Sequence, residues 1–178
     1  MDAYTLINIV LLCFLIITAV AVAVIRNLLT ATILLSVYSL LMAAMYLVLG
    51  APDVAITEAA IGAGISTILL LAALLLTGEK EKASETPGSP LFVIAFTGIA
   101  LIYATLGMPS FGDPSAVTNQ HVAPYYLHAS GEEIGIPNVV TSILASYRGF
   151  DTLGETFVVF TAAISVLLLI GSFSTERK

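Results

Sequence analysis

Residues 148–173 read RGFDTLGETFVVFTAAISVLLLIGSF, a short charged motif that runs directly into a long apolar segment. A helix of about 20 apolar residues crosses the hydrocarbon core of a bilayer. Arg148, Asp151 and Glu155 therefore stand at a membrane boundary, where charged side chains are costly and usually functional. This stretch predicts a transmembrane helix with a polar entrance.

The composition of the whole chain predicts the same class. Of its 178 residues, 58% are hydrophobic and 10% are charged, against about 25% charged in an average soluble domain. We therefore expect an all-α integral membrane protein whose surroundings are the lipid bilayer. The net charge of -6 argues against nucleic acid as a partner, because nucleic acid attracts clustered Lys and Arg.

Apolar periodicity predicts about five transmembrane helices and one short amphipathic helix before the last of them. The segment 91–106 is the shortest span, and the first span lacks the basic start of a signal peptide, so we interpret it as a mature helix. The predicted spans are residues 4–24, 28–49, 53–77, 91–106 and 151–173.

Short connections and a polar segment divide these spans into two modules. Residues 1–77 are predicted to form a three-helix up-down-up module, because only a few residues separate its spans. Residues 78–90 are charged and rich in Pro and Gly, which is typical of a linker. Residues 91–178 form the two-helix module, with an external loop over residues 107–150.

The basic residues predict the orientation. Five Lys and Arg residues fall on one side of the five-span arrangement, and only Arg148 falls on the other. Cytoplasmic segments carry the excess of Lys and Arg, so we expect the N-terminus outside and the C-terminus in the cytoplasm.

Within the external loop, apolar residues recur at helical spacing over residues 138–147, after Pro137. This pattern predicts the short amphipathic helix. It fits a helix lying at the membrane interface and equally a helix covering the ends of the bundle.

The third span contains Gly62 and Gly64 among other small residues. Small residues let a neighbouring helix approach closely. Two glycines beside a carboxylate also permit a π-bulge or a rotation of the helix. Packing alone and a bulged, moving helix are both compatible with the pattern.

The same span begins with two acids. Asp53 follows Pro52 and is predicted to cap the helix. Glu58 lies five residues further along, roughly 7 Å into the span at a rise of ~1.5 Å per residue. Because desolvation raises a carboxyl pKa, Glu58 is a candidate proton-loading group.

In the second acidic motif, Asp151 and Glu155 are four residues apart and share one helix face. One interpretation is a helix capped by Asp151, with an Arg148–Asp151 surface ion pair that would contribute little to stability. The other places Glu155 on a hydrated ion or proton route. His121 and His128 have no companion ligands, so we expect no metal, and no pattern indicates a cofactor or a catalytic centre.

Two motifs carry a family resemblance. The stretch PDVAITEAAIGAG, residues 52–64, resembles the short three-helix subunit of membrane-bound hydrogenases, which also occurs as a domain of the large subunit of Mrp-type multisubunit sodium/proton antiporters. The stretch NVVTSILASYRGFDTLGE, residues 138–155, resembles the partner that follows it in those systems. The chain looks like a fusion of both.

The resemblance implies a five-helix element similar to a small membrane subunit of respiratory complex I, whose third helix can carry a π-bulge. It also implies that Asp53, Glu58, Asp151 and Glu155 lie near ion or proton routes, with Arg148 as ion-pair support. Large antiporter-like subunits are the implied partners. Ser146 departs from antiporter versions, which often carry an acid two residues before the motif's Arg.

We therefore hypothesise a non-redox, non-catalytic subunit of a multisubunit ion-translocating complex in a prokaryotic plasma membrane, either an Mrp-type antiporter or a hydrogenase-like pump. Two alternatives remain: a purely structural scaffold of that assembly, and a small independent carrier.

The orientation can be tested by single-cysteine labelling. We expect a thiol at position 84 to react from the cytoplasm and one at position 130 from outside, because of the asymmetry in Lys and Arg. Labelling of both positions from the same side would contradict the five-span arrangement.

Overall fold

The computed structural model describes residues 3–78 and 88–175. The chain divides into two compact units, Met1–Gly88 and Ser89–Lys178, which are described separately. Most of the predicted linker 78–90 lies outside the described residues. Within the described ranges, every long element is helical.

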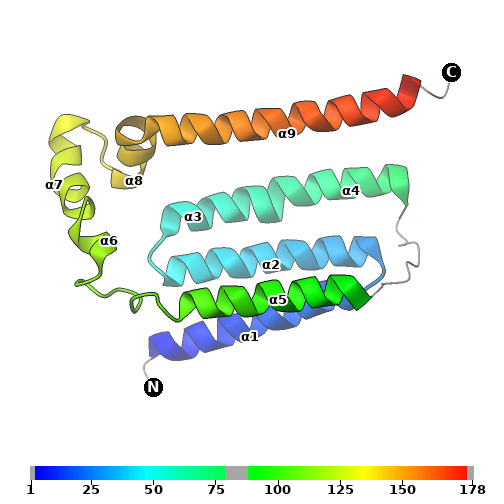
Figure 1. Ribbon diagram of the computed structural model, residues 1–178, viewed down its shortest axis with the longest axis horizontal. Helices are drawn as coiled ribbons and strands as arrows, with labels where there is room; N and C mark the ends of the chain where they lie inside the picture. The colour runs from blue at the N-terminus through cyan, green and yellow to red at the C-terminus, as the bar shows by residue number, and fades with distance from the viewer. Residues whose placement is uncertain (1–2, 79–87, 176–178) are drawn as a thin grey trace. The chain divides into compact units, whose positions relative to one another are not determined.

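The first unit is a three-rod, up-down-up bundle (Figure 1). Its third rod is continuous but contains a π-helical segment, named η1, between two α-helical parts. The elements are α1 (Ala3–Val24), α2 (Leu28–Val48), α3 (Pro52–Thr57), η1 (Glu58–Ile65) and α4 (Ser66–Thr77).

Local sequence signals set the turns of this bundle. Asn27 caps α2, because its side-chain oxygen accepts a hydrogen bond from the Thr30 amide at 2.8 Å. At the other end of α2, Gly50 adopts a φ of 75°, which glycine tolerates without steric cost. Pro52 then starts α3, where its missing N–H costs no hydrogen bond.

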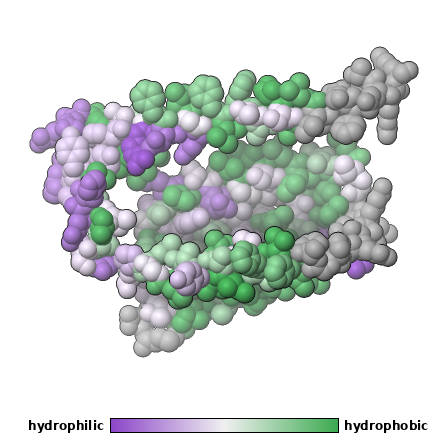
Figure 2. Space-filling model, in the orientation of Figure 1, coloured by the Kyte–Doolittle hydropathy of each residue, from purple (hydrophilic) through white to green (hydrophobic). Residues whose placement is uncertain are grey.

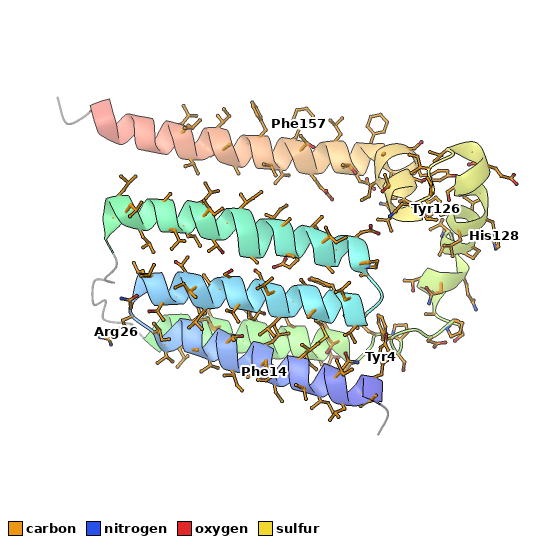
Figure 3. All side chains as sticks on the ribbon, turned by 180° about the vertical axis from the view of Figure 1, so that it is seen from behind. Tyr4, Phe14, Arg26, Tyr126, His128 and Phe157 are labelled. Atoms are coloured by element: carbon orange, nitrogen blue, oxygen red, sulfur yellow. The ribbon has the colours of Figure 1, made fainter. Side chains whose placement is uncertain are left out.

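The exposure of apolar side chains is that of a membrane protein. Among the described residues of this unit, the buried apolar ones are Leu15, Ala43, Met45 and Ala55. Large apolar side chains such as Tyr4 and Phe14 are exposed and project outward from α1 (Figure 3). In lipid such faces need no cover, and in an assembly they can meet other membrane helices.

The third rod contains both a π-helix and a close packing contact at one of its glycines. In η1 the backbone bonds reach five residues back, so some carbonyls lose their usual α-helical partners. The Ser36 hydroxyl on α2 donates to the Ala63 carbonyl at 3.1 Å. The Thr67 hydroxyl donates to the Gly62 carbonyl at 3.4 Å, across a five-residue separation.

Gly62 is a point of close approach between η1 and α2. A Cβ atom at this position would lie 2.6 Å from the Ser39 hydroxyl oxygen and 3.0 Å from the Ser39 Cβ. Gly64 is different, because the nearest atom to its Cβ position is the Ala59 carbonyl oxygen at 3.7 Å. Of the two glycines, only Gly62 is required by packing.

The second unit starts with α5 (Gly88–Thr105) and ends with the long α9 (Gly149–Thr175). Between them lie three short helices and a second π-helical segment, η2, over Ile143–Tyr147. The short helices are α6 (Val117–Gln120), α7 (Ala123–Glu133) and α8 (Val139–Ser142). Hydrophilic residues gather over these short elements, whereas α9 is largely hydrophobic (Figure 2).

The predicted all-α membrane fold is confirmed, and each of the five predicted spans is helical, with one difference of length. Four described helices are long and apolar enough to cross a membrane: Ala3–Val24, Leu28–Val48, Pro52–Thr77 and Gly149–Leu168. The fifth, Leu91–Thr105, is shorter, as its sequence indicated. The chain is a multi-pass, all-α membrane protein.

The loop prediction is confirmed in one part and incomplete in another. The amphipathic helix over residues 138–147 forms as α8 and η2, capped by Asn138, whose side chain accepts from the Thr141 amide at 2.9 Å. Helix α7 was not expected. Because α7 buries Ser130 to 1% exposure, the exposed His128 is a better position for the external label than residue 130.

The two glycines of η1 provide a matched pair of variants. We expect Gly62→Ala to lower the free energy of unfolding by ~1–3 kcal/mol, because the added methyl group would overpack the contact with α2. Gly64→Ala should be neutral or stabilising by up to ~1 kcal/mol, since its methyl group finds space and alanine favours helix. Resistance to unfolding by SDS, followed by circular dichroism, measures both. Equal effects would show that Gly62 has no packing role.

Candidate functional site

Glu58 is the first residue of η1 and the seventh of the rod that begins at Pro52. It is half-buried, and its carboxylate reaches along the helix towards Gly62, where Oε1 lies 2.6 Å from the position of a Cβ on that residue. No hydrogen bond or ion pair is formed by this carboxylate within residues 3–78. Within residues 3–78 the basic residue is Arg26, which precedes α2 and so stands at its opposite end.

Asp53 lies on the same rod but in a different setting. The structure shows that our capping prediction for it was wrong: Ala51 is the N-cap residue and Asp53 lies inside the first turn. Pro52 causes the shift, since proline is favoured at the first helical position. In the first turn, the carboxylate of Asp53 is stabilised by the positive end of the helix dipole.

Arg148 and Asp151 form the predicted ion pair, through Arg148 Nε and Asp151 Oδ2. This hydrogen bond raises the pKa of the Arg148 guanidinium above its usual value. Both side chains are more than half exposed, so solvent screens the pair. Asp151 is not the cap, contrary to one of our interpretations, because α9 already begins at Gly149.

Glu155 shares a face of α9 with Asp151, one turn further into the helix. It is exposed, and in the part of the second unit that the structure describes it makes no hydrogen bond or ion pair. Gly154 beside it has open space within 4 Å of its Cβ position. The Arg148–Asp151 pair therefore does not neutralise Glu155, which is left for a partner or for water.

The two units repeat one arrangement. Glu58 is the seventh residue of its rod, and Glu155 is the seventh residue of α9. Each stands roughly 9 Å beyond its helix start, at ~1.5 Å per residue. A π-helix occurs near each of them, but at different distances: η1 begins at Glu58 itself, whereas η2 ends at Tyr147, eight residues before Glu155. The Thr152 hydroxyl ties α9 to η2 by donating to the Leu144 carbonyl at 2.9 Å.

A cluster of three tyrosines and one acid was missed by the sequence analysis. The Tyr125 hydroxyl donates to Glu133 at 2.8 Å, and the Tyr147 hydroxyl donates to the same carboxylate at 2.6 Å. Tyr126 packs against both, with its ring 6.0 Å from that of Tyr125 and 4.9 Å from that of Tyr147, on the side of α7 that faces η2 (Figure 3). The cluster holds α7 against the end of η2, next to Arg148.

These hydrogen bonds change the acid–base behaviour of the cluster. The bond to Glu133 raises the pKa of Tyr147 from 10.0 to about 12. The bonds from Tyr147 and Tyr125 lower the pKa of Glu133. The hydrogen bond between Tyr147 and Glu133 therefore contributes its full stabilisation below pH 10.0, and this contribution is lost as the pH rises towards about 12. At low pH the same hydrogen bond weakens, because Glu133 becomes protonated.

Spectrophotometric titration of tyrosinate tests this cluster. The chain has seven tyrosines, and we expect the latest of them to titrate near 12, because ionised Tyr147 would face the Glu133 carboxylate. Tyr147→Phe should remove that component, and Glu133→Gln should move it back towards 10.0. An unchanged titration in both variants would mean that the hydroxyl does not bond to Glu133.

Both histidines lie in the second unit. In the described ranges no group of three or more His, Cys, Asp or Glu residues could hold a metal ion. His121 lies beyond α6 and His128 lies on α7, away from the acids of both motifs in sequence and element.

Comparison with known sequence families divides the chain at the same place. Residues 13–79 match the MbhD family of MBH, and residues 91–178 match the MbhE family of MBH. The two matches include Glu58 in the first and Arg148, Asp151 and Glu155 in the second.

Curated relatives contain both parts in a longer protein. The chain is 30% identical over 163 residues to the A subunit of the Na(+)/H(+) antiporter of Bacillus subtilis and 26% identical over 163 residues to that of Alkalihalophilus pseudofirmus. Each alignment covers 92% of this chain and 20% of the relative. A probable A/B subunit of a K(+)/H(+) antiporter of Rhizobium meliloti is 29% identical over 72% of this chain and 13% of its own length.

The chain thus spans about a fifth of the length of the first two relatives. Its two matches are contiguous apart from the short segment that separates them, and together they account for both membrane units. The chain therefore belongs to the MBH family of small membrane subunits, and it joins an MbhD domain to an MbhE domain in one polypeptide.

Proposed function

We propose that this chain is a non-catalytic subunit of a multisubunit complex that moves protons in exchange for a monovalent cation across the plasma membrane. The names of its relatives, which are cation/proton antiporter subunits of several bacteria, support the reaction class. The observation that carries the proposal is the repeated placement of Glu58 and Glu155 seven residues into membrane helices, each without a charged partner among the described residues of its own unit.

Such a carboxylate suits proton exchange better than a structural role. An acid that is needed only for folding is usually paired or accepts backbone hydrogen bonds, as Asp151 is paired with Arg148. Glu58 is half-buried beside η1 and can alternate between protonated and ionised forms as its hydration changes. In the proposal, Glu58 and Glu155 exchange protons, while Asp53, Asp151 and Arg148 shape the polar helix entrances.

The chain is proposed to work only as part of a larger assembly. Its membrane helices leave most large apolar side chains exposed, including Ile68 and Leu75 on α4 and Phe157 on α9 (Figure 3). These faces fit contact with large antiporter-like membrane subunits as well as with lipid. An independent carrier would need to enclose its ion path within these few helices, and the exposure of Glu155 does not favour that alternative.

The cation is left open between sodium and potassium, because the names of the relatives contain both. The proposed proton chemistry of the two glutamates is the same in either case. We further propose the orientation given by the basic residues, with the N-terminus outside, and the division into modules 1–77 and 91–178 joined by the linker 78–90.

A scaffold role remains the second candidate, and the first-turn positions of Asp53 and Asp151 favour it for those two residues. Both lie where a carboxylate stabilises a helix through its dipole. The scaffold interpretation extends this role to Glu58 and Glu155, and it predicts that neutralising them affects assembly and leaves transport per assembled complex intact.

Neutral variants separate the two candidates. In inverted membrane vesicles with the assembled complex, we expect Glu58→Gln and Glu155→Gln each to reduce cation-dependent proton movement by about tenfold or more, because glutamine keeps the shape and removes proton exchange. Asp53→Asn should do less harm. Glu132→Gln, at an exposed acid on α7, is the matched control and should transport normally.

Complex yield is measured alongside, and sodium and potassium are supplied in separate assays. Normal transport in both glutamine variants would contradict the proton-exchange role. Reduced transport with either cation, at unchanged yield, would contradict the scaffold candidate and would show which cation the complex accepts.

A further inference from the structure

Among the polar side chains that make no hydrogen bond within residues 3–78, two lie at one contact between helices. They are the Glu58 carboxylate on η1 and the Ser39 hydroxyl on α2. Both Glu58 Oε1 and Ser39 Oγ lie 2.6 Å from the same point, the position of a Cβ atom on Gly62. The absent side chain of Gly62 therefore leaves a small space that a carboxylate and a hydroxyl enter from opposite helices.

The Ser39 hydroxyl does not make the backbone hydrogen bond that is common for hydroxyls on helices. Serine and threonine in helices commonly donate to the carbonyl three or four residues back. Thr18 and Thr32 do so in this unit, at 2.8 Å each, and Thr77 does so at 3.0 Å. Ser39 makes no such bond in the described residues, so its proton and lone pairs are available at the space above Gly62.

The neighbouring serine, Ser36, differs from Ser39 because its hydroxyl already has a hydrogen-bond partner. Ser36 lies one turn away on the same face of α2, and it donates to the Ala63 carbonyl of η1 at 3.1 Å. The Ser36 hydroxyl therefore already donates its proton to the backbone of the π-helix. Ser39, at the level of Gly62, faces the Glu58 carboxylate instead.

Other charged groups are far from this space. The remaining charged side chains of residues 3–78 are Arg26 and Asp53. Arg26 lies at the opposite end of α2, and Asp53 lies in the first turn of α3, more than one turn before Glu58. On the described elements packed against Glu58, a neutral hydroxyl is therefore the group available to it.

We propose that Ser39 is the hydrogen-bond partner of Glu58 in its proton exchange, and that Gly62 is glycine in order to admit both groups. This inference rests on the proposed function. The protonated carboxyl donates its O–H to Ser39 Oγ. When Glu58 loses its proton, the serine hydroxyl rotates and donates to the carboxylate. Ser39 is a positioning residue: it forms a hydrogen bond with Glu58 in both the protonated and the ionised state, and it carries no charge itself.

Infrared difference spectroscopy of the purified complex, between acidic and alkaline pH, tests the inference directly. The carbonyl band of protonated Glu58 is the band that Glu58→Gln removes. We expect Ser39→Ala to move this band to higher frequency, because a carboxyl that loses a hydrogen bond has a stiffer C=O. Ser39→Cys should give an intermediate shift, since a thiol is a weak partner. Ser36→Ala is the matched control and should leave the band in place.

The transport assay then distinguishes the inference from the function on which it rests. We expect Ser39→Ala to slow proton movement severalfold at unchanged complex yield, and less than Glu58→Gln does. A Glu58 band that stays in place in Ser39→Ala and Ser39→Cys would overturn the inference and leave the proposed function standing. A shifted band together with normal transport in Glu58→Gln would support the pairing and overturn the function. Absence of any band that Glu58→Gln removes would overturn both.

Discussion

The constraint that governs this structure is the need to satisfy backbone polar groups inside a hydrocarbon layer. No water is available there, so a helix normally bonds every N–H and C=O within itself. The π-helix η1 departs from that pattern near the middle of a bundle, and neighbouring hydroxyls compensate. Ser36 reaches across from α2 to the Ala63 carbonyl, and Thr67 bonds to the Gly62 carbonyl from within the rod. A hydroxyl also bonds to a π-helical carbonyl at η2, outside the membrane spans, where Thr152 donates to Leu144.

These hydroxyl–carbonyl hydrogen bonds lie at the segments that position the acidic side chains. Because η1 begins at Glu58, the carboxylate lies over a helix surface that is already irregular and lined by small residues, where α2 comes close. In the second unit, η2 and α9 meet at Arg148, and the tyrosines around Glu133 fix the approach of α7 to that junction. A charged group in a membrane segment is thus placed beside backbone that departs from regular helix, and the hydroxyls that stabilise the backbone add to the local polarity.

The sequence predicts the spans well because long apolar runs have few alternatives in a bilayer, and residues 4–24, 28–49 and 53–77 all form helices close to those bounds. It does not locate helix starts to the residue. Asp53 and Asp151 have the right chemistry for caps, but Pro52 and Gly149 begin their helices earlier. The tyrosine cluster was not predicted, because one of its bonds lies within the unexpected helix α7 and the other joins α7 to η2, and the sequence does not say how those two elements approach each other.

The π-helix also has a consequence for the shape of the third rod. Each residue of an α-helix advances the side-chain direction by about 100°, and a wider turn delays that advance. The side chains of α4 are therefore out of phase with those of α3, although both belong to one continuous rod from Pro52 to Thr77. A neighbouring helix that packs along the whole rod would contact one stripe of residues in one leaflet and a differently directed stripe in the other. Two separate neighbours can therefore bind the rod, one to the stripe on α3 and one to the stripe on α4.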